Sequence, residues 1–250
     1  MGRGSTAAQA VALGAREAAG AVRGVPDALE RAGTARARTF LETATGGTRL
    51  VIEGAGGYDF RTGRGRLRVV VPAQGAASGE RKPITELFTP GALYMKDRGA
   101  GVPADKWVRI DTAALGDGNL VTGGATDPGA AVELLRAARD VAYVGPAEVG
   151  GVAVGHYRGT ADLGEAAKAA TPRMRGALAA AAEGFATDAV PFDAYLDPEG
   201  RLRKVRHRFS FVNAGREVEV ASTTVLYGFG EPVDVRLPPR RDIYEGTIED

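Results

Sequence analysis

The segment RLRKVRHRFSFVN, residues 201–213, alternates basic and apolar side chains and constrains the fold more than any other part of the chain. From Lys204 to Ser210 the even positions are polar, and from Val205 to Phe211 the odd positions are valine, histidine and phenylalanine. Successive side chains of a β-strand point to opposite faces of the sheet, so this period of two predicts a strand with one solvated and one buried face. Such a strand needs neighbours with a matching apolar face.

Residues 216–229 supply one neighbour. A turn at residues 214–215 would place Phe211 opposite Val218 and pair the other apolar positions in the same way. A shift of one residue would instead place Phe211 opposite Glu217, which favours the first register.

The basic side chains of residues 201–208 raise the question of nucleic-acid binding. The chain carries 32 Lys and Arg against 31 Asp and Glu, so it lacks the overall charge that draws proteins to polyanions. The aromatic side chains that single-strand binders stack on bases lie on the opposite face of this strand. We interpret the basic run as the solvated outer face, with Arg208 diagonal to Glu219, and expect no nucleic-acid partner.

Further extended segments, separated by Gly, Pro and Asp, occur along most of the chain. They are residues 34–44, 48–60, 65–71, 84–88, 92–96, 106–111, 150–163 and 189–196. Short connections favour antiparallel neighbours, because parallel strands need long crossovers. The sequence DPEG at 197–200 predicts a turn, since Pro198 presets φ and Gly200 accepts a positive φ.

Three segments have helical spacing of apolar residues. The first is an amphipathic N-terminal helix over about residues 6–31. The second covers TDPGAAVELLRAARD, residues 126–140, where Thr126 or Asp127 can cap the helix and Pro128 suits its first turn. The third covers residues 171–185, and alanine occupies most of the face that large apolar side chains leave free.

These segments predict an antiparallel sheet of about 10 or 11 strands with three helices, an α+β arrangement. No internal repeat or low-complexity linker divides the chain. We therefore expect a single domain over residues 1–250, with the sheet and its covering helices in residues 34–239 and a C-terminal tail in residues 240–250.

No motif brings together the groups that catalysis or metal binding requires. The sequence contains no cysteine, and none of its serines lies in a nucleophile elbow. His156 and His207 are the only histidines and lack the spacing of a metal-binding helix. We expect both to be interior histidines, with His207 hydrogen-bonded opposite Ser222, and we expect a non-enzymatic protein without a cofactor or metal.

An ordered series of segments resembles actinobacterial lipoproteins of the LppX/LprG type, within the LolA-like lipoprotein-carrier superfamily. The segments are GGYDFRTGRGRLRVVVP, LFTPGALYMKD, KWVRID, DPGAAVELLRAARDVAYVG, VGHYRGTADL, PFDAYLDPEGRLRKVRHRFSF and YGFGEPVDVRLPP. The resemblance covers about residues 5–239 and implies a strongly curved antiparallel half-barrel, helices over its concave face, and a hydrophobic cavity between them. Members of this family bind or carry acyl-chain lipids or lipoproteins.

The alternation of the strands and the helical spacing place one set of apolar side chains toward this cavity. They are Leu67, Val69, Val71, Leu93, Met95, Val108, Ile110, Leu134, Leu135, Met174, Leu178, Phe185, Phe209, Phe211, Val218 and Val220. A bent sheet beneath alanine-rich helices leaves space unless large side chains fill it. A close-packed core is the alternative, because protein interiors are normally close-packed.

The resemblance implies a lipid-binding or lipid-carrying lipoprotein of the cell envelope, exported and held at the membrane surface by a lipid anchor. Neither an export signal nor an anchor cysteine is present in this sequence. The alternative is an envelope lipoprotein that binds and regulates a membrane sensor or another protein partner.

Overall fold

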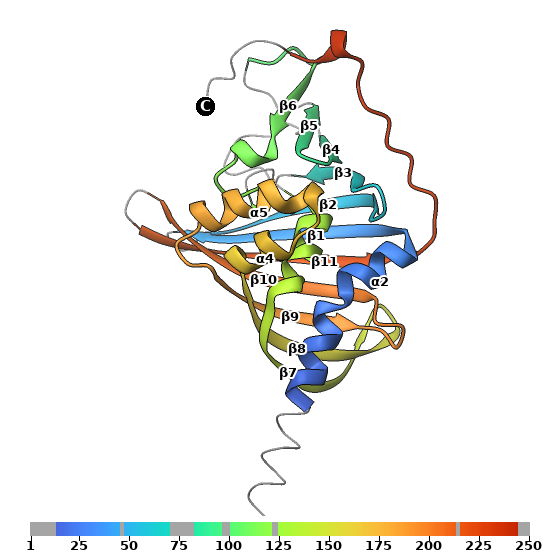
Figure 1. The fold of residues 1–250 in the computed structure, drawn as a ribbon. Helices are drawn as coiled ribbons and strands as arrows, with labels where there is room; N and C mark the ends of the chain where they lie inside the picture. Colours follow the sequence, from blue (N-terminus) through green and yellow to red (C-terminus); the bar gives the residue numbers. More distant parts are fainter. Residues whose placement is uncertain are drawn as a thin grey trace, which may run out of the picture.

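The computed structural model describes residues 14–45, 48–70, 83–96, 101–121, 125–213 and 216–244, and its centre is one open antiparallel sheet (Figure 1). The sheet has 11 strands in the order β6-β5-β4-β3-β2-β1-β11-β10-β9-β8-β7. The strands are β1 (Thr34–Thr45), β2 (Thr48–Asp59), β3 (Arg64–Val70), β4 (Ile84–Thr89), β5 (Ala92–Lys96), β6 (Trp107–Asp111), β7 (Ala138–Val149), β8 (Val152–Asp162), β9 (Ala189–Leu196), β10 (Leu202–Asn213) and β11 (Arg216–Tyr227).

The helices gather on the concave side of the sheet (Figure 1). They are α2 (Val25–Ala32), α3 (Pro128–Glu133), α4 (Leu163–Ala169) and α5 (Pro172–Gly184), and residues 14–23 are also helical. This arrangement confirms the predicted α+β fold with a curved half-barrel sheet. The side chain of Asp127 caps α3 by accepting a hydrogen bond from the Gly129 amide at 2.8 Å, as the sequence predicts.

The β10–β11 hairpin has the register predicted from the alternation. Phe211 lies opposite Val218, Phe209 opposite Val220, and Ser210 opposite Glu219. Residues 214–215, where the turn was predicted, lie outside the described residues. Gly200 has a φ of 74° in the DPEG turn.

Two elements differ from the sequence prediction. The helix that begins at Pro128 ends at Glu133, continues as a short 3₁₀ turn, and gives way to strand β7 at Ala138. The predicted extension of this helix to about residue 140 is therefore wrong, because the chain turns back into the sheet. Helix α4 was not predicted; the Asp162 side chain caps it by accepting a hydrogen bond from the Glu165 amide at 3.0 Å.

After β11 the chain forms a strap, residues 228–244, that runs past the ends of the strands to the β6 edge (Figure 1). The Gly230 amide donates to the Thr34 carbonyl at 2.9 Å where the strap begins. At its other end Ile243 forms a parallel bridge with Trp107, and the Tyr244 amide donates to the Trp107 carbonyl at 2.8 Å. The strap therefore covers part of the edge of the outermost strand.

The basic run lies on the outer face, as predicted, and each of its arginines has an acidic partner. Arg208 pairs with Asp193 at 3.0 Å, and Arg206 pairs with Glu42 at 3.4 Å. The register places Arg208 diagonal to Glu219, as predicted, while the ion pair of Arg208 is with Asp193 of β9. Burial acts to raise the pKa of Asp193, but hydrogen bonds from His156, Arg158 and Arg208 outweigh it and hold this pKa below its ordinary value.

Candidate binding site between sheet and helices

The predicted cavity-lining side chains come together between the sheet and the helices. Most of them are buried: Leu67, Val69, Leu93, Met95, Val108, Leu134, Leu135, Met174, Leu178, Phe185, Phe209 and Val220. Ile110, Phe211 and Val218 are partly buried, and Val71 lies outside the described residues. Ten of the buried residues belong to one continuous apolar cluster that extends from strand β5 to strand β10. The two layers are therefore joined by a single apolar interface.

A small pocket marks the border of this interface below α2 and α5. Its volume is about 20 Å³, and its apolar lining includes Tyr58, Phe60, Val132 and Met174. A space of this size holds about one water molecule, whereas pockets for lipid-sized ligands are at least roughly 300 Å³. This pocket is closed to an acyl chain in the conformation described.

The small residues of α5 are used for close backbone contact. A Cβ added at Gly184 would lie 1.7 Å from the Gly116 carbonyl oxygen, and one added at Gly118 would lie 2.0 Å from that of Ala177. The loop after β6 therefore lies directly against α5 and occupies room that the alanine-rich face was expected to leave open. Gly118 also has a φ of 59°, which favours glycine at that position.

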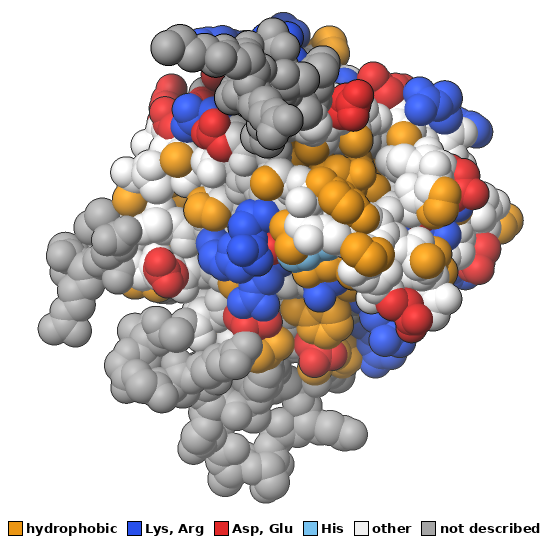
Figure 2. All heavy atoms as spheres, turned by 90° about the horizontal axis from the view of Figure 1, so that it is seen from below, with side chains coloured by type: hydrophobic (Ala, Val, Ile, Leu, Met, Phe, Trp, Pro, Cys, Tyr) orange, Lys and Arg blue, Asp and Glu red, His pale blue; other side chains and the backbone are white. Residues whose placement is uncertain are grey.

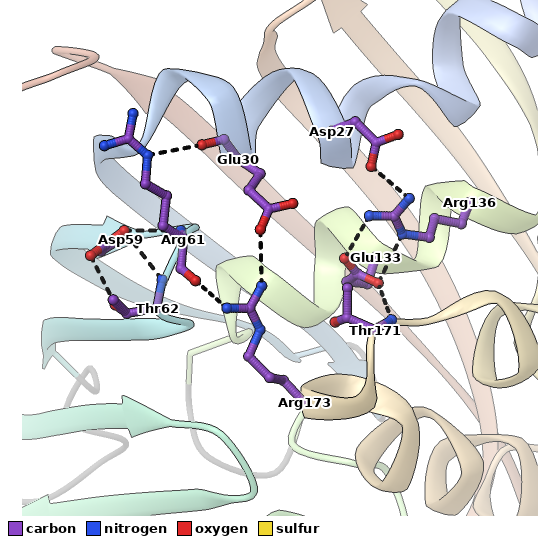
Figure 3. Close-up of polar contacts among 9 residues, drawn as sticks. All are labelled: Asp27, Glu30, Asp59, Arg61, Thr62, Glu133, Arg136, Thr171 and Arg173. Atoms are coloured by element: carbon purple, nitrogen blue, oxygen red, sulfur yellow. Dashed lines mark hydrogen bonds and ion pairs between the residues drawn. The ribbon is translucent and has the colours of Figure 1, made fainter.

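Polar side chains form a rim around the pocket (Figure 3). Arg173 at the start of α5 pairs with Glu30 of α2 at 3.5 Å and donates a hydrogen bond to the Arg61 carbonyl. Because both side chains of this ion pair are substantially exposed, it contributes at most about 1 kcal/mol. The contact between α5 and α2 at this point is therefore weak.

A second group of rim contacts connects α2, α3 and the segment between α4 and α5. Arg136 pairs with Asp27 at 2.8 Å and with Glu133 at 3.0 Å (Figure 3). Glu133 also accepts a hydrogen bond from the Thr171 amide at 3.0 Å. Most of the charges at the mouth of the pocket are thus engaged with one another.

Beneath the rim, two ionisable groups are fully buried next to each other. Burial raises the pKa of Asp127 to about 6, although the Gly129 amide donates a hydrogen bond to its carboxylate, and the Ala130 amide and the Tyr58 hydroxyl nearby act to lower this pKa. Burial and the neighbouring Asp127 carboxylate together raise the pKa of Tyr58 well above its ordinary value. Sequence analysis found the capping role of Asp127 but had no signal for its partnership with Tyr58.

Further along the inner face, buried polar atoms lack hydrogen-bond partners among the described residues. They include the hydroxyls of Thr39, Thr224 and Tyr58 and both ring nitrogens of His207. His207 is interior, as predicted, but its predicted hydrogen bond is not found within the described part of the chain. Burial lowers the pKa of its imidazole to about 3, so the ring is neutral at physiological pH.

The two histidines are placed differently. The prediction that His156 is interior in the same way was wrong: it lies on the outer face, where it contacts Asp193 at 2.8 Å and stacks on Tyr195 with ring centroids 4.5 Å apart. Inside, Ser222 lies opposite His207, but its hydroxyl is hydrogen-bonded to Thr126 and forms no nucleophile–base pair with the ring. Within the described ranges, no group of three or more His, Asp or Glu side chains could hold a metal.

Two larger hollows lie on the outer face, beside the tip of the β7–β8 hairpin. One has a volume of about 360 Å³, and its lining includes Arg38, Val152, Val225 and Tyr227. The other, of about 410 Å³, includes Phe40, Glu148 and Lys204. Figure 2 views the molecule from the end where β7 lies, and hydrophobic side chains form a band there beside a group of Lys and Arg side chains.

An open, curved antiparallel sheet with helices on its concave face defines the architectural class of this chain. Among the solved structures similar to it is the lipoprotein LppX of Mycobacterium tuberculosis, with a TM-score of 0.46 and 9% identity over 88% of this chain and 99% of that chain. Another is LprF of Mycobacterium bovis, with a TM-score of 0.44 and 12% identity over 89% of this chain and 97% of that one.

The complex of MucA and MucB from Pseudomonas aeruginosa is also similar, with a TM-score of 0.35 and 14% identity over 92% of this chain and 61% of that chain. No protein-family model matches the sequence, and no curated protein matches it significantly. No helix within the described residues combines the length and apolar content that crossing a bilayer would need.

Proposed function

We propose that this protein is a non-catalytic lipid-binding lipoprotein of the cell envelope that takes an acyl chain between its sheet and its helices. The observation that carries the proposal is the continuous apolar interface, to which strands and helices far apart in the sequence contribute. Its location would be extracytoplasmic, at the membrane surface. Burial of apolar groups is the main driving force that such an interface offers to a ligand.

Binding would require α5 and the loop against it to move away from the sheet, because the pocket at the border is too small for a chain. An acyl chain of about 16 carbons would contribute on the order of 10 kcal/mol of gross transfer free energy, at about 0.8 kcal/mol per buried CH₂. Most of this cancels when the chain leaves a membrane, so uptake would be reversible. The weak rim contact between Arg173 and Glu30 would open at little cost.

Two neighbouring valines of β3 provide a matched test. Val69 is 0% exposed on the inner face and Val70 is 50% exposed on the outer face. We expect Val69→Trp to abolish acyl-chain uptake by filling the interface, whereas Val70→Trp should leave uptake unchanged. The measurement is native mass spectrometry after incubation with phospholipid vesicles, followed by solvent extraction.

Met174→Trp on α5 is a second blocking variant in case Val69→Trp does not fold, which circular dichroism would show. Failure of the wild-type protein to take up any amphiphile from the vesicles would contradict the proposal.

A second candidate function is the binding and regulation of an envelope protein partner. The specific observation in its favour is that the outer-face hollows, about 360 and 410 Å³, are much larger than the pocket below the helices. Val69→Trp should then leave partner capture intact, while Val225→Glu in the outer hollow should reduce it. Loss of capture in Val69→Trp alone would favour the lipid function instead.

A further inference from the structure

Three polar residues occupy adjacent positions on the inner face of the sheet. Thr39 of β1 lies directly opposite Thr224 of β11. Ser222, two residues from Thr224 on the same face, lies opposite His207 of β10. The exposed fractions of Thr39, Thr224 and His207 are 2%, 1% and 0%. They form a compact polar patch within the apolar interface.

Without a ligand, this patch lowers the free energy of unfolding. Neither hydroxyl and neither ring nitrogen of these three side chains has a hydrogen-bond partner among the described residues. A buried polar group left without a partner costs about 1–3 kcal/mol, while an apolar residue of the same shape at each position would avoid that cost. By contrast, Ser222 is satisfied through Thr126, so the inner face can provide partners where it needs them.

The surroundings of the patch leave its polar atoms directed at apolar groups. The His207 ring lies between Phe192 and Phe209, with centroid distances of 6.3 and 5.8 Å. Thr39 faces Gly54 of β2, where a Cβ would come within 2.4 Å of its hydroxyl oxygen. A ligand that reaches this part of the interface would therefore meet hydrogen-bonding groups at the patch, with aromatic side chains beside them.

Resting on the proposed function, we propose that Thr39, Thr224 and His207 form the anchor for the polar end of an acyl chain, and that this end is an uncharged ester. The side chains are neutral, since two are hydroxyls and the third is an imidazole held uncharged by burial. A carboxylate or phosphate placed there would be a buried charge without a counterion, which is strongly unfavourable. An ester carbonyl accepts hydrogen bonds and carries no charge, so it matches the patch.

Three probes with the same chain length test this chemistry: methyl dodecanoate, dodecane and dodecanoate, delivered from cyclodextrin at neutral pH. We expect the wild-type protein to bind the ester more tightly than the hydrocarbon or the carboxylate. Thr224→Val and His207→Leu should each weaken ester binding by about five- to ten-fold, the effect of one neutral hydrogen bond, and leave dodecane binding unchanged. Binding is measured by competition with a fluorescent fatty-acyl ester.

Thr223→Val is the matched control, because Thr223 is the next residue of β11 and lies on the outer face opposite Arg206. It should leave the binding of all three probes unchanged. The unfolding free energy of Thr224→Val and His207→Leu should be equal to or above that of the wild type, which separates a lost anchor from a damaged fold.

The proposal is overturned if the wild-type protein shows no preference for the ester, or if both inner-face variants keep that preference. Binding of dodecane without a preference for the ester would remove the anchor and leave the lipid-binding function intact. Binding of none of the three probes would remove the lipid-binding function itself, and the anchor with it.

Discussion

At the scale of single residues, Asp127 and His207 give the fold two opposite responses to pH. The pKa of Asp127 is raised to about 6, so between pH 4 and 6 the folded protein holds a proton there that the unfolded chain has lost. The pKa of His207 is lowered to about 3, so in the same range the unfolded chain holds a proton there that the folded protein lacks. Each effect changes the unfolding free energy by about 1.4 kcal/mol per pH unit, with opposite signs.

We therefore predict that, when either residue is substituted, the pH dependence of the unfolding free energy is set by the one that remains. In Asp127→Asn, which keeps an effective N-cap, stability should fall as the pH decreases from 6 to 5, because His207 still resists protonation. In His207→Leu, stability should rise over the same interval. Urea unfolding at several pH values measures both slopes, and parallel curves for the two variants would contradict the prediction.

The placement of individual residues was predictable where the alternation was strong. His207 could be assigned to the inner face because its neighbours at 205, 209 and 211 are all apolar. His156 could not be assigned in this way, since the inner positions around it on β8 include Gly155 and Gly159. A Cβ at Gly159 would meet Phe192 at 2.8 Å, so the neighbouring strand supplies the apolar group that β8 itself lacks.

At the scale of secondary-structure elements, the sequence predicted the strands that have clear alternation and turn signals, but it did not predict β7 or α4. The stripe of Leu134, Leu135 and Ala138 continues the helical pattern into β7. Irregular pairing between Arg139 and Ala142, and again between Tyr143 and Gly145, removes the period of two that would have revealed the strand. Helix α4 has only seven residues, too few for a periodic pattern to be recognised.

The contact between α5 and the loop after β6 leads to a second prediction. Gly184→Ala should lower the unfolding free energy by about 1–3 kcal/mol, because the new methyl group would overlap the backbone of Gly116. The substitution on the other side of this contact, Gly116→Ala, places its Cβ in open space and should change the unfolding free energy by less than about 0.5 kcal/mol. Thermal unfolding of the two variants compares the two sides of one contact.

The same contact explains why the packing below α5 was beyond sequence analysis. An alanine-rich helix face is compatible with an open cavity and equally with a closely approaching backbone. Only the spatial neighbours distinguish these cases. Gly116 is more than 50 residues from Gly184 in the chain, and Gly118 is more than 50 residues from Ala177. Folding brings each pair into contact, and no sequence pattern indicates it.

At the scale of the whole molecule, the strap joins the end of the described chain to the β6 edge. We predict that truncation after Glu231 will speed hydrogen exchange in β5 and β6 and promote association, because the edge of β6 loses its contacts with Ile243 and Tyr244. Truncation after Tyr244 is the control and should behave like the full chain. Hydrogen exchange and light scattering measure the two effects, and identical behaviour of both truncations would contradict the prediction.

Strand β1 occupies the middle of the sheet with β2 on one side and β11 on the other. Its pairing with β11 joins residues such as Thr39 and Thr224, which are separated by most of the chain. During synthesis, β1 to β6 can assemble early, yet one side of β1 stays without a partner until β11 has left the ribosome. The growing chain therefore carries an open strand edge for most of its synthesis, and residues 216–227 close that edge only near the end.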